Sequence, residues 1–236
     1  MTGRQIIKNT ATTVAATAAI AAAGYAALVV FNRAQYGKVK GFAEKGKDFL
    51  LDRFIPEPEV AEQHQIGIDA PADVVMAAAR EIEFLKSPVI RAIFKMRELA
   101  LGGAPDGRDH PTALVDQMQS IGWVVLAEQP GREIVFGTAT QPWQAAPVFR
   151  SIPTGEFRDF AEPGYVKIVW TLRADPIDER RSTFHTETRA CTTDAAARRR
   201  FRNYWSLVAP GVEVIRMAML GPLRRAAEAR VARDAA

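Results

Sequence analysis

The sequence has almost no cysteine and little histidine, and each shortage narrows what the protein can be. The single cysteine is Cys191, so no intrachain disulfide can form and the fold must be held by its buried core. The compartment stays open, because proteins of oxidising compartments also fold without disulfides. The three histidines, His64, His110 and His185, have no partner at a metal-ligand spacing. The sequence therefore predicts neither a disulfide scaffold nor a zinc or iron site.

Cofactor and catalytic motifs are also missing. The pair Gly102-Gly103 is not followed by the Lys and Ser/Thr of a phosphate-binding loop. Serine, histidine and acidic residues are present, but no nucleophile-elbow sequence accompanies them. We therefore expect no cofactor, and the motifs assign no catalytic residue.

Positive charge gathers at the C-terminus. The net charge is only +4, yet Asp194 to Ala236 holds nine arginines against four acidic residues. This asymmetry favours an anionic partner, either lipid headgroups or nucleic acid, although a solvated basic helix face has the same pattern. No nucleic-acid recognition motif accompanies Arg198, Arg199, Arg200 and Arg202. Nucleic acid is therefore not expected as the partner, and an interaction module with a basic C-terminal helix stays an alternative.

A long uncharged run lies near the start of the chain. Ala11 to Phe31 is 21 residues without a formal charge, ten of them alanine. A helix rising about 1.5 Å per residue is then long enough to cross a hydrocarbon core about 30 Å thick. Two basic residues precede the run and five follow it before Asp48. This bias predicts a single-pass membrane anchor with the following domain in the cytoplasm.

Two other interpretations of this run stay open. The basic start, the weakly apolar centre and Ala21-Ala22-Ala23 before Gly24 also suit a cleaved signal peptide, which would make the protein periplasmic or secreted. A soluble helix, alone or docked on a partner, is the third interpretation. The length of the run and its aromatic residues Tyr25 and Phe31 favour the anchor.

Composition divides the chain into three parts. Residues 1–33 form the apolar segment, whether anchor or signal. Residues 34–58 are a basic stretch with three glycines, expected to be a juxtamembrane linker that lies on anionic headgroups or simply connects its neighbours. Pro56 and Pro58 end this linker. Residues 59–233 are expected to form one folded domain.

The folded domain begins with a strand and two helices and continues with strands. A strand is expected over Glu62–Ile68, followed by a helix that Asp69 caps. Ser87-Pro88 starts the second helix and Gly102-Gly103 stops it. Alternation then predicts strands at Trp123–Ala127, Glu133–Thr140, Phe157–Phe160, Val166–Leu172 and Phe184–Arg189.

One long helix ends the chain. Asp194 is expected to cap it, and Pro210-Gly211 predicts a kink inside it. Its buried face is expected to hold Phe201, Trp205, Val208, Val212, Ile215 and Met219, spaced by four and three residues. A meander of strands and one long helix after an initial strand and two helices is an α+β layout.

Four segments, taken in order, resemble a known superfamily. They are Glu128-x-Pro-Gly-Arg132-Glu133, Phe160-x-Glu162-Pro163-Gly164-Tyr165, Thr186-Glu187-Thr188-Arg189 and Asp194…Ala197-Arg198…Phe201…Tyr204-Trp205…Pro210-Gly211. Together they are similar to a bacterial branch of the START-like superfamily, also called SRPBCC or polyketide-cyclase-like, over about Glu59 to Glu228. The resemblance implies the helix-grip fold, in which a curved antiparallel sheet and a long C-terminal helix enclose a hydrophobic cavity. That superfamily includes lipid carriers, hormone receptors, aromatase/cyclase subunits and ring-hydroxylase subunits, so fold does not decide function.

The cavity implied by this resemblance would be lined by aromatic and threonine side chains. The expected lining residues are Phe136, Thr138, Trp170, Phe184, Thr186, Thr188 and Trp205. Aromatic side chains of this kind line ligand cavities, and they equally fill ordinary cores.

Three polar residues on one strand form a second candidate set. His185, Glu187 and Arg189 alternate, so their side chains share one face of the strand. If that face lined the cavity, a cyclase or dehydratase could use His185 and Glu187 for proton transfer. Otherwise the three face solvent or form cross-strand ion pairs with Lys167 or Arg173.

The leading hypothesis is a membrane-tethered binder or carrier of a hydrophobic small molecule or lipid, with no catalysis assigned. It depends on the cavity-forming layout, the apolar N-terminal run and the missing catalytic motifs. The alternatives are an enzyme of the cyclase/dehydratase type and an interaction module with a basic helix.

Overall fold

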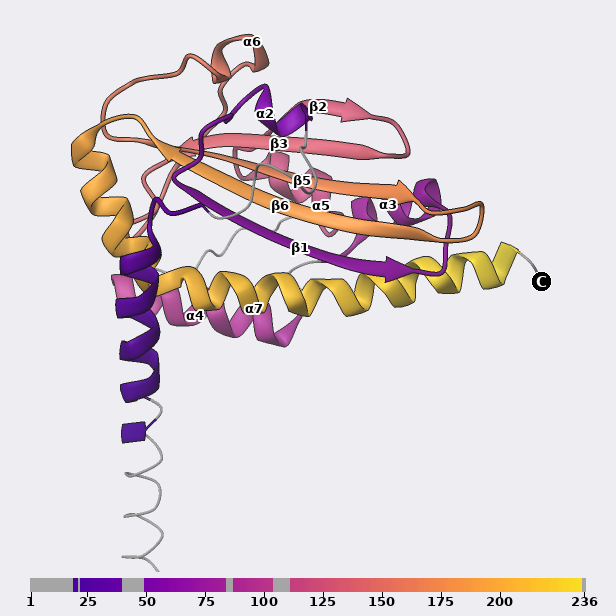
Figure 1. Ribbon diagram of the computed structural model, residues 1–236, viewed down its shortest axis with the longest axis horizontal. Coiled ribbons are helices and arrows are strands. Elements are labelled where there is room, and N and C mark those ends of the chain that lie inside the picture. Colours follow the sequence, from indigo (N-terminus) through magenta and orange to yellow (C-terminus); the bar gives the residue numbers. More distant parts are fainter. Residues whose placement is uncertain (1–18, 21, 40–48, 84–86, 104–110, 235–236) are drawn as a thin grey trace, which may run out of the picture.

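The computed structural model describes residues 19–20, 22–39, 49–83, 87–103 and 111–234 (Figure 1). Residues 11–18 and 21 of the run expected to be the anchor lie outside these residues, as does His110. A helix over 22–35 comes first. It is followed by α2 (Phe49–Asp52), β1 (Val60–Ile68), α3 (Ala72–Glu81), α4 (Pro88–Leu101), α5 (Leu114–Ser120), β2 (Val124–Gln129), β3 (Glu133–Thr140), β4 (Phe149–Arg150), α6 (Thr154–Phe157), β5 (Val166–Pro176), β6 (Ser182–Thr192) and α7 (Ala195–Asp234).

The strands form one antiparallel sheet. Its order is β1-β6-β5-β3-β2, with β4 paired to β3, so the first strand of the domain lies beside the last. The long arm of α7 runs beside the sheet, and α4 lies against α7 (Figure 1). The α+β helix-grip fold expected from the sequence is therefore confirmed.

Local capping signals account for most element ends. Ser87 caps α4, because its Oγ accepts a hydrogen bond from the N–H of Ile90 at 3.5 Å. Gly102 ends the same helix in the left-handed conformation, with φ of 69°. Asp194 caps α7 as expected, since its Oδ1 accepts from two backbone N–H groups of the first turn at 2.6 and 2.8 Å.

Three local expectations were wrong. Asp69 does not cap α3, whose N-cap residue is Pro71 without a side-chain hydrogen bond. The segment Phe157–Phe160 is not a strand, because Thr154–Phe157 forms the helix α6. Its Phe157 is fully buried and meets the ring of Phe54 edge-on at 6.1 Å. The short helix α5 was not expected at all.

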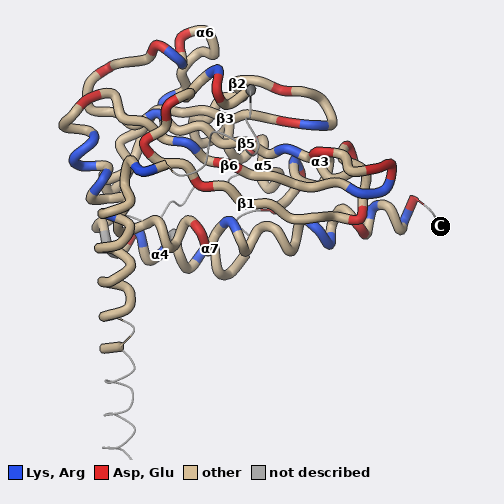
Figure 2. Tube along the Cα trace, in the orientation of Figure 1, with Lys and Arg blue, Asp and Glu red and all other residues tan. Residues whose placement is uncertain are grey.

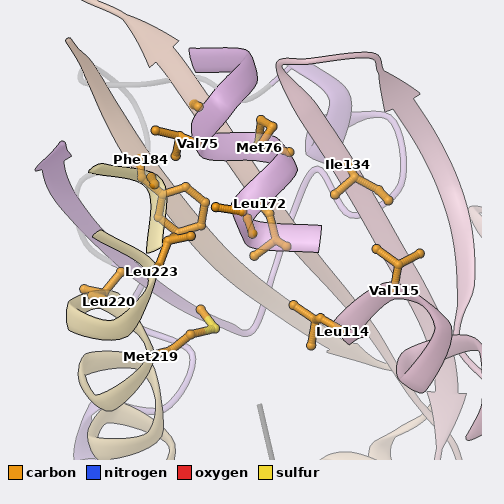
Figure 3. Close-up of a cluster of buried hydrophobic side chains, with 14 of the residues drawn as sticks. Val75, Met76, Leu114, Val115, Ile134, Leu172, Phe184, Met219, Leu220 and Leu223 are labelled. Carbon is orange, nitrogen blue, oxygen red and sulfur yellow. The ribbon is translucent and has the colours of Figure 1, made fainter. Parts of the chain in front are cut away.

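The face of the sheet toward α7, here called the inner face, holds the main core. Figure 3 shows Met219, Leu220 and Leu223 of α7 pointing toward Phe184 and Leu172 of the sheet. Side chains of α3 and α5 complete this cluster. The two residues at the end of the buried face expected for α7, Ile215 and Met219, are both at most 9% exposed. Helix and sheet therefore stabilise each other by burying apolar surface.

The helix α7 bends. It extends from Ala195 to Asp234 with Pro210 inside it, and Figure 1 shows its axis changing direction between a first arm and a longer second arm. Proline cannot donate the hydrogen bond of its turn, and its ring pushes away the preceding turn. The bend agrees with the kink expected at Pro210-Gly211, and it lets one helix cover both the end and the length of the sheet.

The opposite, outer face of the sheet is covered as well. Leu51, Phe54 and Ile55 are at most 5% exposed and pack with Val135 and Val169 of the sheet. These three belong to the stretch that composition assigned to the linker. Residues 49–55 thus pack onto the domain.

Gly137 of β3 lies where the outer face is tightest. A Cβ added there would meet Leu126 Cδ1 at 2.3 Å and Phe157 Cε2 at 2.9 Å, whereas one added at Gly67 of β1 would meet nothing within 4 Å. We expect Gly137→Ala to lower the free energy of unfolding by about 1–3 kcal/mol through overpacking. Gly67→Ala, the matched control, should leave it unchanged or raise it slightly. Urea denaturation of both variants measures the difference, and equal stabilities would contradict this packing.

Among the described residues, α7 is the one helix long and apolar enough to cross a membrane by length and composition alone. Its buried side chains pack on the sheet.

Candidate ligand-binding interior

A row of side chains crosses the inner face of the sheet at mid-length. Antiparallel register pairs Glu62 of β1 with Thr188 of β6, Thr188 with Trp170 of β5, and Trp170 with Phe136 of β3. Directly opposed residues of an antiparallel sheet share a face, so these four side chains lie side by side. The neighbouring row contains His64 opposite Thr186. The inner face is therefore apolar toward β3 and polar toward β1.

Arg216 of α7 reaches this row from the opposite side. Its guanidinium carbon lies 4.3 Å from the centre of the Trp170 ring, and its Nη2 donates a hydrogen bond to Thr188 Oγ1. Trp170 in turn donates from Nε1 to Thr186 Oγ1 at 2.7 Å. The helix thereby places a cation on an aromatic face inside the grip, an arrangement favourable by about 0.5–2 kcal/mol.

No carboxylate of the described chain lies within ion-pair distance of Arg216. Burial lowers the pKa of its guanidinium, to about 9, and the charge of Glu62 partly opposes this effect. Burial likewise raises the pKa of Glu62, helped by the nearby Glu213, while Arg216 opposes that shift. The cation is thus only loosely compensated by the protein itself.

His64 completes the polar side of the interior. Its Nδ1 is buried and has no hydrogen-bond partner among the residues that the structure covers. Burial lowers the pKa of its imidazole, and the positive charge of Arg216 lowers it further, against a smaller opposite effect of Glu213. A buried nitrogen left unsatisfied costs free energy, and a ligand could satisfy it.

The seven residues expected to line a cavity do not all share one environment. Phe136, Trp170, Phe184 and Thr186 are at most 2% exposed on the inner face, and Thr188 lies beside them. Thr138 is also buried, but its hydroxyl donates to the carbonyls of Gly122 and Arg150 in the loops near β4. Trp205 packs on Phe201, with ring centres 5.9 Å apart, in a separate cluster near the start of α7.

The second candidate set lies on the outer face, away from Arg216. Arg189 and Glu187 are 1% and 2% exposed, and the Nε of Arg189 is 2.5 Å from Oε1 of Glu187. Arg189 also contacts Asp52 of α2 at 2.5 Å and donates to the carbonyl of Ile55 at 3.1 Å. His185 Nε2 lies 3.4 Å from Asp175 Oδ2. The structure therefore gives Glu187 and Arg189 a part in holding residues 49–55.

Two surface grooves adjoin the grip. One of about 320 Å³ is lined by the end of the N-terminal helix, the start of β1 and Trp205, and it reaches Glu62. The other, of about 330 Å³, lies between α3 and the C-terminal turns of α7, where Asp73 and Arg230 contribute to it. Only the first leads toward the polar side of the interior. In the described residues no group of three or more His, Cys, Asp or Glu side chains is arranged to hold a metal ion.

Sequence reasoning missed Glu62, His64 and Arg216. A signal was present for the first two, because they alternate with Ile66 and Ile68, which face the core. For Arg216 the signal was its position beside Ile215 on the helix face that packs against the sheet. Charge alone does not show that Arg216 faces the sheet, and only the packing of α7 does.

The neutral His64 gives the protein a predicted pH dependence. The imidazole has an ordinary pKa of 6.5 when unfolded and a lower one when folded. Below about pH 6.5 the unfolded chain therefore binds the proton first, and stability falls as the pH decreases toward the folded pKa. We expect wild type to lose more stability than His64→Gln between pH 7.5 and pH 5.5, by at most ~1.4 kcal/mol per pH unit. Parallel urea titrations at the two pH values test this, and identical losses would contradict it.

Comparison with known proteins gives similarity at low sequence identity. No family model and no curated protein matches the sequence. A hypothetical protein from Helicobacter pylori is 10% identical with a TM-score of 0.37, over 74% of this chain and 92% of the other. The Zhui aromatase/cyclase from a Streptomyces species is 15% identical with a TM-score of 0.30, over 73% and 95%. A conserved protein from Geobacillus kaustophilus is 11% identical with a TM-score of 0.32, over 72% and 95%. By its own element order, its antiparallel sheet and its long C-terminal helix, the chain has an α+β fold of the helix-grip type.

Proposed function

We propose that the protein is a membrane-tethered binder or carrier of a hydrophobic small molecule or lipid, with no catalytic step. The observation that carries this proposal is Arg216, a cation inside the grip that stacks on Trp170 and has no carboxylate partner in the described chain. A desolvated cation is costly unless something neutralises it. A ligand with an anionic or hydrogen-bond-accepting head would do so.

The surroundings of Arg216 suit an amphipathic ligand. The unsatisfied Nδ1 of His64 and the hydroxyl of Thr188 lie on the polar side, where a head group would be held. Phe136, Leu172 and Phe184 lie on the apolar side, where a hydrocarbon or ring system would be buried. A mostly apolar site with a few convergent polar groups is the usual form of a small-molecule site.

Tethering is supported by the N-terminal helix. Its apolar side chains are exposed, among them Leu28 at 49%, Val30 at 67% and Phe31 at 57%. A helix that is apolar on all sides is stable when lipid or protein surrounds it. The excess of basic residues after the run favours a cytoplasmic domain. The intact mass of the mature protein distinguishes an anchor from a signal peptide, because cleavage after Ala23 would remove 23 residues.

The two alternatives receive less support. An enzyme using His185 and Glu187 would need them in the interior, and they lie on the outer face. Two of the four arginines Arg198, Arg199, Arg200 and Arg202 already contact other parts of the protein. Arg202 donates to the carbonyl of Arg33 at 3.0 Å, and Arg198 lies 3.9 Å from Glu59. Arg199 and Arg200 remain exposed.

Native mass spectrometry of the full chain, released from detergent micelles, tests the proposal. We expect a co-purifying apolar molecule that is lost on denaturation, and less of it bound to Arg216→Met than to wild type. A clean unliganded mass, together with no thermal shift across a panel of lipids and aromatic compounds, would overturn the proposal.

A further inference from the structure

The helices α4 and α7 expose apolar side chains on the side that faces away from the sheet. On α4, Val89, Met96 and Leu99 are 44%, 60% and 72% exposed. On α7, Leu207, Val214 and Met217 are 50%, 41% and 52% exposed. We call these six residues the apolar face. Water would solvate so many large apolar side chains unfavourably, and such a patch marks a binding surface.

The apolar face is separate from the face by which α4 packs. Val89, Met96 and Leu99, with the exposed Ala92 between them, follow a three-four-three spacing along one side of α4. Ile90 is buried, and Ile93 approaches α7 at Gly211, where an added Cβ would meet its Cγ2 at 3.2 Å. The helix thus has one apolar side toward α7 and a second toward the outside.

The N-terminal helix leaves the domain on this same side. Figure 1 shows the N-terminal helix running away from the sheet, transverse to the long arm of α7. In the same view α4 lies level with the C-terminal turns of the N-terminal helix. Its position is fixed by contacts with α7: Tyr25 donates its hydroxyl to the carbonyl of Leu207, and Arg33 donates to Asn203. A bilayer that holds this helix would therefore meet α4 and α7 along their lengths.

The charges around the apolar face fit an anionic surface. Arg91 and Lys95 are exposed on α4 beside it, and Lys95 lies 3.6 Å from Glu98 of the same helix. Glu213 of α7 is exposed too, but its charge acts on Glu62 and His64 of β1. Figure 2 shows the basic residues of the first arm of α7 at the end of the molecule from which the N-terminal helix leaves. Basic residues next to apolar ones are typical of helices that lie in the headgroup region of anionic membranes.

We propose that the apolar face rests on the surface of an anionic bilayer, with α4 and the long arm of α7 lying in the plane of the headgroups. This inference rests on the proposed tethering and deepens it, since it fixes the orientation of the domain. The six apolar side chains enter the boundary between headgroups and acyl chains. The groove that reaches Glu62 starts at Phe31 and therefore opens beside the same leaflet.

Site-directed fluorescence in vesicles tests this orientation. Full-length protein carrying Cys191→Ala is given one new cysteine, Met96→Cys or Met217→Cys on the apolar face. The matched control is Ile177→Cys, an apolar residue 59% exposed in the turn between β5 and β6. Each is labelled with an environment-sensitive dye and reconstituted into phosphatidylcholine vesicles containing about 30% phosphatidylserine, with or without doxyl-labelled lipid.

We expect emission at shorter wavelength and quenching by doxyl lipid at positions 96 and 217, and neither at position 177. Arg91→Glu with Lys95→Glu should reduce both signals at position 96. Water-like emission at all three positions, in protein that alkaline carbonate does not extract, would overturn the orientation while leaving the tether intact. Shorter-wavelength emission without doxyl quenching would mean that a second protein copy covers the face, and would overturn it as well. Extraction by carbonate would instead show that the protein is not anchored in the bilayer, and would overturn the proposed tethering on which the inference rests.

Discussion

Replacing Arg189 with leucine should lower the free energy of unfolding by about 3–5 kcal/mol, the loss typical of breaking a buried ion pair. Arg189 is 1% exposed and neutralises Glu187, which is 2% exposed, across 2.5 Å. Its removal leaves a buried carboxylate without that cation. It also releases Asp52 and the carbonyl of Ile55, so residues 49–55 lose their polar attachment to the sheet. Urea denaturation followed by tryptophan fluorescence measures the loss.

Two further variants separate this effect from a general loss of charge. The double variant Arg189→Leu with Glu187→Leu should recover most of the stability, because an apolar pair of similar volume avoids the desolvation cost. Arg80→Leu breaks the exposed pair with Glu128, whose side chains are 40% and 37% exposed, and should cost less than ~1 kcal/mol. A loss in Arg189→Leu as small as in Arg80→Leu would show that the contacts of Arg189 with Glu187 and Asp52 do not hold residues 49–55 on the outer face.

Replacing Arg216 with methionine should weaken binding of a long-chain carboxylate such as dodecanoate by roughly 10- to 150-fold. A hydrogen bond to a charged group contributes about 1.5–3 kcal/mol, and methionine removes it while keeping the volume. The unliganded protein should not lose stability, because the substitution also removes a half-buried cation that has no carboxylate within ion-pair distance in the described chain. Displacement of a fluorescent fatty acid measures the affinity, and thermal unfolding measures the stability.

The controls for this prediction vary the ligand and the position. Dodecanol has the same chain without the charge, so its affinity should change far less between wild type and Arg216→Met. Arg224→Met removes an exposed arginine of the same helix, paired with Glu228, and should leave dodecanoate binding unchanged. Equal weakening for dodecanoate and dodecanol would mean that Arg216 supports the packing of the interior without binding the head group.

Much of the fold could be predicted because its signals are local. The strand Glu133–Thr140 is predicted with the bounds it has as β3, since alternation and a preceding Pro-Gly turn mark it, and Gly131 has φ of 72°. The cap at Asp194 is equally local. Local signals do not predict short segments such as α6. Its Phe157 is buried by Phe54, which is about a hundred residues away in the chain.

In the candidate site, too, the residues with a local signal could be predicted and those that depend on distant contacts could not. Alternation placed Phe136, Trp170 and Thr186 on one face of the sheet, and the structure places them on the inner face. The charged members could not be found in this way, because the contacts of Arg216 with Trp170 and Thr188 depend on how α7 packs against β5 and β6. Composition predicts a linker for residues 49–55, because their docking on the sheet depends on a contact between Arg189 and Asp52, 137 positions apart, that no local pattern shows.

We propose that an amphipathic ligand lies inside the grip with its head at Arg216. The most direct test is photo-crosslinking of the full chain with a fatty acid that carries a diazirine on its tail, followed by mapping of the modified peptides. We expect crosslinks on inner-face segments of β3, β5 and β6 and on α7 near Met219, all competed by unlabelled dodecanoate. Crosslinks confined to the N-terminal helix or the apolar face, without competition, would show that the protein meets lipid only as a membrane surface and would contradict a ligand-binding interior.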